Sequence, residues 1–290
     1  MSASDLRLSA YGQQLAALQW PGQGEPILAL HGWLDNAASF LPLAEHIRQP
    51  MVAMDFAGHG LSDHRPGQVA LHLIDHVRDV MAVADALGWQ RFTLMGHSMG
   101  AGVATFVAAT FPERVSRLVL IEGLGPPTTA ADEAPDTLRK AIADMAALPD
   151  KRKPVYCDQD DAVAARTRGF GGLSVAASRL LCERGLMTVE GGWTWRADSR
   201  LRLTSSLRLT EEQVEGFVRA IQAPVCLVVG DQGLGNSGFF SHRLAWLKNL
   251  RLETLSGRHH LHMEAPARVA GVINAFLGTT EGDQKHHDRC

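Results

Sequence analysis

Residues 92–102 read FTLMGHSMGAG, and this stretch decides the fold. An apolar run that predicts a buried strand ends in residues 96–100, GHSMG, and small residues with helical spacing follow. In the pattern G-x-S-x-G the serine occupies a strained strand-to-helix turn with its hydroxyl exposed, and the close backbone approach leaves room only for small flanking residues. We therefore expect Ser98 to be a nucleophile. The alternative is a glycine-rich turn that contains a serine by coincidence.

Other short apolar runs alternate with amphipathic stretches on both sides of this motif. Such alternation favours an α/β fold, with a mostly parallel central sheet and helices on both faces. The expected strands are Ile27–Leu30, Met51–Met54, Phe92–Met95, Leu118–Ile121 and Val225–Val229, and the expected helices are 38–47, 71–87, 101–110 and 266–277.

The pattern changes after Gly125, where helical spacing at 137–148 and 160–181 continues without strand runs. We therefore expect a core formed by residues 1–125 and 213–278, interrupted by a mainly helical cap at 126–212. The polar residues 279–290 are expected to form a disordered tail.

The composition of the chain limits the kinds of binding partner and the cellular location that we expect. The 290 residues carry a formal net charge of −3, which gives no electrostatic case for binding nucleic acid or an anionic membrane. No uncharged apolar run approaches the roughly 18 residues that span a bilayer, and residues 1–20 do not resemble a signal peptide. Cys157, Cys182, Cys226 and Cys290 show no metal-ligand spacing. We expect a cytoplasmic monomer or homodimer that holds no metal and acts on a small molecule.

A second turn follows the run 27–30, where residues 31–33 read HGW. Acyl transfer requires two N–H donors aimed at the oxyanion that forms in the transition state. We expect these donors to be the backbone N–H groups of Trp33 and of Met99, the residue after the nucleophile. A third motif, DFAGHGLS at 55–62, has the glycines of a tight turn and is interpreted as structural.

HGW, DFAGHGLSD, GHSMGAG and a late histidine region occur in the order found in the α/β-hydrolase superfamily. The chain resembles its serine-hydrolase-like proteins and small capped carboxylesterases over about 25–123 and 213–278. GRHHLHMEAP at 257–266 is similar to the family pattern G-x-H-x-x-H-x-E-x-P, whose first histidine is catalytic. The resemblance implies that His259 is the base, that His262 supports it, and that His260 points aside. His31 and His97 flank the site.

The acid that orients the histidine is less obvious, because Gly233 stands where superfamily members commonly place an aspartate after Gly230. Asp231 lies nearby and is one candidate. The other is Glu122, which ends the buried run 118–121; a carboxylate there is costly unless it is paired. Some haloalkane dehalogenases resemble this chain in placing a glutamate 24 residues after the nucleophile, the separation of Glu122 from Ser98. We favour Glu122 and keep Asp231 as the second candidate.

A serine nucleophile predicts an acyl-enzyme pathway without a cofactor. The simplest hypothesis is that the substrate is a small or medium apolar carboxylic ester. Trp33, His97, Trp193 and Trp195 are the candidate substrate-binding residues. Cap residues such as Phe170 and both cap tryptophans could line a pocket, or could form the core of the cap itself. C–C bond hydrolysis, lactone opening and perhydrolysis use the same triad, and a non-catalytic ligand-binding scaffold or an interaction protein are the alternatives outside enzyme function.

Overall fold

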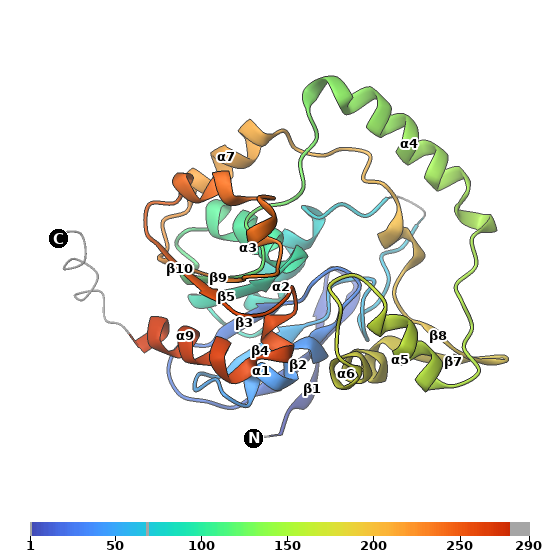
Figure 1. The fold of residues 1–290 in the computed structure, drawn as a ribbon, viewed down its shortest axis with the longest axis horizontal. Helices are drawn as coiled ribbons and strands as arrows, with labels where there is room; N and C mark the ends of the chain where they lie inside the picture. The colour runs from blue at the N-terminus through green and yellow to red at the C-terminus, as the bar shows by residue number, and fades with distance from the viewer. Residues whose placement is uncertain (1, 68–69, 279–290) are drawn as a thin grey trace.

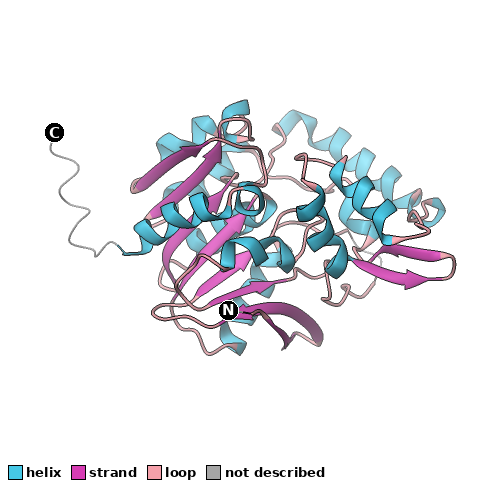
Figure 2. Ribbon diagram, turned by 60° about the horizontal axis from the view of Figure 1, so that its bottom comes forward, coloured by secondary structure: helices cyan, strands magenta, loops and turns pink. Residues whose placement is uncertain are grey.

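The computed structural model describes residues 2–67 and 70–278. Within these residues, eight strands form one sheet in the order β1-β2-β4-β3-β5-β6-β9-β10 (Figures 1 and 2). The pairs β1–β2 and β2–β4 are antiparallel and the other neighbours are parallel, so the expected mostly parallel sheet is confirmed. The strands are β1 Ser4–Ala10, β2 Gln13–Trp20, β3 Ile27–Leu30, β4 Met51–Met54, β5 Phe92–His97, β6 Val115–Ile121, β9 Val225–Gly230 and β10 Leu250–Leu255.

Helices cover both faces of the sheet, as its central strands require because they are buried on both sides. Adjacent residues of β9 show this: Leu227 packs in the cluster on one face, and Val228 in the cluster on the other. The first face is covered by α2 Asp75–Ala86, α3 Met99–Thr110 and α7 Glu211–Ala220, and the second by η1 Ala37–Phe40, α1 Leu41–Ala44, α8 Leu261–Glu264 and α9 Pro266–Gly278. Two further 3-10 turns, η5 Gly235–Ser237 and η6 Ser241–Trp246, follow β9.

The segment expected to form the cap is mainly helical but not wholly so. It contains η2 Ala131–Glu133, α4 Ala134–Ala146, η3 Leu148–Asp150, α5 Gln159–Thr167, α6 Val175–Gly185, β7 Leu186–Val189, β8 Gly192–Trp195 and η4 Ser199–Arg202. Figure 1 shows α4 standing apart from the sheet, with α5, α6 and the hairpin below it.

Two expectations for this segment were wrong. Strands were not expected, yet β7 and β8 pair as a hairpin whose turn uses Gly191 and Gly192 at positive φ. The single helix expected at 160–181 is two helices, because the chain turns at Gly171 and Gly172 with φ of 88° and 61°. The boundaries 126 and 212 stay a prediction, and residues 279–290 lie outside the described part of the chain. Of the helices described, none is long and apolar enough to cross a membrane.

Candidate active site

Ser98 lies in a strained turn between β5 and α3. Its backbone has φ 53° and ψ −114°, a conformation that a residue with a side chain rarely adopts. The turn is tight because a Cβ on Gly96 would lie 2.4 Å from the carbonyl oxygen of Gly100, and one on Gly100 would lie 2.1 Å from that of Leu30. The two glycines therefore allow the serine to project from the carboxyl edge of the sheet, where it is partly exposed.

Strain is concentrated around this edge. Among the described residues, the non-glycine positions with positive φ are Tyr11, Leu34, Ser98 and Glu122. Leu34 lies in the turn after β3, Ser98 in the turn after β5, and Glu122 at the end of β6. Residues held in such conformations cost about 1–3 kcal/mol each and cluster at functional sites, so their distribution marks this edge.

His259 connects the serine to a carboxylate. Its Nε2 lies 2.9 Å from Ser98 Oγ, and its Nδ1 lies 3.1 Å from Glu122 Oε2. An ionised carboxylate only accepts hydrogen bonds, so Nδ1 donates to Glu122 and Nε2 is left to accept the serine proton. His259 is 5% exposed and Glu122 is fully buried, which keeps water from competing for these bonds. The structure thus brings together the three residues expected to form a triad.

Glu122 directly follows β6, and its side chain extends across the carboxyl end of the neighbouring strand β9. Its Oε1 accepts a hydrogen bond from the N–H of Gly230, and its Oε2 accepts one from the N–H of Leu234, both at 2.6 Å. A Cβ on Gly233 would lie 2.2 Å from Glu122 Oε2. The glutamate carboxylate therefore fills the space in which an aspartate side chain at position 233 would begin.

Asp231, the second candidate for the acid, directly follows β9. It is exposed, and its Oδ1 accepts a hydrogen bond of 2.9 Å from the N–H of Gly257 at the start of the histidine loop. Asp231 therefore connects the loop after β9 to the histidine loop. The carboxylate that accepts a hydrogen bond from His259 is that of Glu122.

The expected oxyanion donors meet at the same turn. The close approach of Gly100 to Leu30 and His31 brings the first turn of α3 against the turn that contains Trp33. The first N–H groups of a helix have no partner within it. Across the described residues, no hydrogen bond to another protein group occupies the backbone N–H of Trp33 or of Met99. Both groups are therefore available to a ligand. The Trp33 indole, which is 46% exposed, donates to the carbonyl of Leu201.

Three comparisons with known proteins show the family of this chain. Residues 25–154 match a family described as alpha/beta hydrolase fold. A serine hydrolase-like protein of Danio rerio is 31% identical, over 98% of this chain and 91% of its own length. The chain belongs to the α/β-hydrolase superfamily. A hypothetical protein of Pseudomonas aeruginosa PAO1 has a crystal structure with 47% identity and a TM-score of 0.91, covering 95% of this chain and 99% of that one. The thioesterase domain from the curacin biosynthetic pathway is 25% identical with a TM-score of 0.84, covering 94% and 100%.

Three histidines near the triad of this α/β-hydrolase, His97, His262 and His31, are buried, and burial lowers the pKa of each. His97, expected among the substrate-binding residues, is instead fully buried behind the triad, and its Nε2 donates to the carbonyl of His259. Burial, with His262 beside it, holds the pKa of His97 well below its usual value. Burial also lowers the pKa of His262 to about 3 and lowers that of His31, whose Nδ1 donates to the carbonyl of Gly32.

Asp35, which follows the HGW turn, was not expected to take part in the site. His260 is buried, and its Nε2 lies 3.4 Å from Asp35 Oδ2. Ligand atoms of Asp35, His97 and His260 lie within 4.8 Å of one another, all from buried residues, so this group could offer three ligands to a metal ion. Arg166 from α5 already pairs with the carboxylate of Asp35. Although burial by itself would raise the pKa of Asp35, the contact with His260 and the charge of Arg166 hold it well below its usual value.

The cap residues divide into two groups. Phe170 packs edge-on against the ring of His259, with centroids 5.1 Å apart, and is 62% exposed. Trp193 and Trp195 instead pack with Tyr156 and Val163 in a hydrophobic cluster of the cap's own. Among these three aromatic residues, therefore, the structure places only Phe170 beside the triad.

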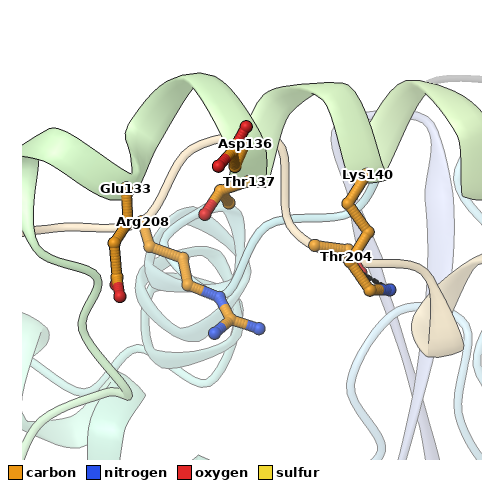
Figure 3. Close-up of a pocket in the computed structure, with 6 residues that line it drawn as sticks. All are labelled: Glu133, Asp136, Thr137, Lys140, Thr204 and Arg208. Carbon is orange, nitrogen blue, oxygen red and sulfur yellow. Dashed lines mark hydrogen bonds between the residues drawn. The ribbon is translucent and has the colours of Figure 1, made fainter.

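Two cavities lie along α4. One of about 370 Å³ opens between the helix and the returning segment 204–208, lined by Glu133, Asp136, Thr137, Lys140, Thr204 and Arg208 (Figure 3). The other, of about 300 Å³, is lined by Ala141, Ile142, Met145, Ala146 and Ser206. Ser98 and His259 line neither of these two cavities.

Proposed function

We propose that this α/β-hydrolase cleaves a small or medium apolar carboxylic ester through an acyl-enzyme intermediate on Ser98. The observation that carries the proposal is the continuous hydrogen-bond chain from Glu122 through His259 to the partly exposed Ser98 Oγ. In the scheme, Nε2 of His259 takes the hydroxyl proton while Oγ attacks the ester carbonyl carbon.

The negative charge that develops on the carbonyl oxygen is stabilised by the N–H groups of Trp33 and Met99. The imidazolium of His259 then returns its proton to the departing alkoxide, and the alcohol leaves. Water, activated by the same nitrogen, attacks the acyl group and releases the acid. Glu122 holds Nδ1 as the donor and stabilises the imidazolium in both halves of the reaction. The scheme uses no cofactor.

The preference for an apolar substrate is supported by the aromatic surface beside the nucleophile. Phe170 contacts His259 and is well exposed, and the half-exposed Trp33 carries one of the two oxyanion donors. Hydrolysis of acyl compounds also fits the relationship to the curacin thioesterase domain, since thioesters and esters share the acyl-enzyme route.

Labelling with a fluorophosphonate probe tests the proposal. We expect one adduct on Ser98 in the wild-type protein and none in Ser98→Ala. A series of p-nitrophenyl esters from acetate to octanoate should be hydrolysed with turnover that disappears in the same variant. Folded wild-type protein that neither labels nor hydrolyses any member of the series would contradict the proposal and favour a ligand-binding scaffold. The monomer or homodimer and the cytoplasmic location stay predictions.

A further inference from the structure

A buried ion pair joins the cap to the core directly behind the catalytic histidine. Arg166 Nη2, from α5, lies 2.5 Å from Asp35 Oδ1, and Nε2 of His260 lies 3.4 Å from Asp35 Oδ2. The side chains of Asp35 and Arg166 are 1% and 13% exposed. Because solvent screens a buried ion pair little, its electrostatic interaction with neighbouring groups is strong.

His97 also lies beside Asp35 but does not donate a hydrogen bond to it. Its Nε2 faces the carbonyl oxygen of His259, which only accepts, so Nε2 carries the proton and Nδ1 carries a lone pair. That lone pair lies 3.9 Å from Asp35 Oδ2 and has no hydrogen-bond partner among the described residues. His97 therefore offers Asp35 no proton. Arg166 faces Oδ1 of the buried carboxylate, and its permanent charge balances that of Asp35, while Nε2 of His260 faces Oδ2.

The same cap segment rests on the histidine turn. Its loop, residues 168–174, begins beside Arg166 and ends where the N–H of Ser174 donates to Glu264 Oε1 at 2.7 Å. Between these anchors, Phe170 packs on the ring of His259. A Cβ on Gly171, whose φ is 88°, would lie 2.5 Å from the His260 ring and 3.4 Å from His259 Cβ. At Gly171 the loop thus lies too close to the two histidines to carry a side chain.

We propose that Arg166 and Asp35 are positioning residues: their ion pair seats the 168–174 loop on the histidine turn and so keeps His259 aligned with Ser98. The proposal rests on the proposed function, since alignment matters only if His259 is the base. It makes the seating of the cap a condition for proton transfer. A cap that lifts away would leave Asp35 buried without its cation and would remove Phe170 and Gly171 from the histidines.

The test compares Arg166→Met with Arg179→Met. Arg179 is also a cap arginine in an ion pair, with Asp160, but its partner is exposed and belongs to the cap. We expect Arg166→Met to lower the rate of fluorophosphonate labelling and the kcat for p-nitrophenyl butyrate by about ten- to a hundredfold, because small misplacements of a catalytic group have effects of this size. KM should change by less than about threefold, and Arg179→Met should stay within about twofold of wild type in all three values.

Arg166→Lys separates a positioning role from a loss of folding, because it keeps the charge in the ion pair. We expect it to recover most of the labelling rate, whereas equal losses in the lysine and methionine variants would overturn the ion pair as the cause. Wild-type labelling rates in folded Arg166→Met protein would overturn the proposal. So would a loss of wild-type activity on treatment with EDTA, since a metal would then be the cation beside Asp35. Failure of wild-type protein to label at all would instead contradict the proposed function.

Discussion

Replacing Glu122 by glutamine keeps the size of the side chain and removes its charge. Three donors converge on the carboxylate: the N–H groups of Gly230 and Leu234 at 2.6 Å and Nδ1 of His259 at 3.1 Å. A glutamine amide has one acceptor oxygen and one NH₂ group. At least one of the three buried donors must therefore face another donor in Glu122→Gln.

The magnitude follows from which donor loses its partner. A buried donor left unsatisfied costs about 1–3 kcal/mol, so we expect a loss of that size in the free energy of unfolding. If Nδ1 of His259 faces the NH₂ group, the ring adopts the tautomer that cannot accept the serine proton. The corresponding change in a serine protease lowers kcat about 10⁴-fold, which at 1.36 kcal/mol per tenfold is about 5 kcal/mol of barrier.

The assay is kcat/KM for p-nitrophenyl butyrate, with urea unfolding measured in parallel. Asp231→Asn is the matched control, because Asp231 is exposed and its Oδ1 accepts a hydrogen bond from the N–H of Gly257. We expect Asp231→Asn to keep kcat within about threefold and to cost at most about 1 kcal/mol of stability. A drop of several orders of magnitude in Asp231→Asn, with Glu122→Gln close to wild type, would refute the assignment of the acid.

Three further changes test the surrounding structure. Gly100→Ala should destabilise the protein by about 1–3 kcal/mol in urea unfolding, because its Cβ meets the Leu30 carbonyl at 2.1 Å, whereas Gly102→Ala, with a nearest contact of 3.4 Å, should be tolerated. The folded-state pKa of His262, about 3, lies below the usual 6.5, so between these values the unfolded chain binds more protons than the folded one. The free energy of unfolding therefore decreases as the pH is lowered through this range. His262→Phe should therefore remove about 2 kcal/mol of the stability lost between pH 7.5 and 5, and an unchanged acid sensitivity would contradict this. Arg243 is buried; it pairs with the partly exposed Glu211 and donates to the carbonyls of Leu124 and Pro126. Arg243→Met leaves these two carbonyls without their donor and should cost about 1–3 kcal/mol in thermal unfolding; a cost below about 0.5 kcal/mol would contradict this.

The central strands could be predicted from the sequence because they are buried on both faces and are nearly continuous apolar runs. β3, β4, β5, β6 and β9 lie where such runs occur, within a few residues at their ends. β1, β2 and β10 were not among the expected strands. β10 includes Arg251 and Glu253 and lies at the edge of the sheet, where exposed positions alternate with partly buried ones. An edge strand of this kind carries little of the apolar signal that identifies a central one.

The candidate site was predictable where its chemistry is local. Ser98 and His259 lie in motifs whose spacing reflects a tight turn or a short loop, and Glu122 was favoured because a glutamate that ends a buried strand needs a partner. The pair of Arg166 with Asp35 gave no such signal, because the residues are 131 positions apart and neither belongs to a motif. Trp193 and Trp195 show the opposite limit: aromatic residues on an alternating stretch indicate burial but not what they pack against.

Trapping the acyl-enzyme tests the central claim most directly. Protein mixed with p-nitrophenyl butyrate, quenched in acid within the first turnover and digested should yield a peptide containing Ser98 that carries one butyryl group. Ser98→Ala should yield none, and Glu122→Gln should accumulate it about 10⁴-fold more slowly if the carboxylate orients His259 as described. Ester hydrolysis by the wild-type protein with no acyl group on Ser98 at any quench time, or with the group on another residue, would contradict the account.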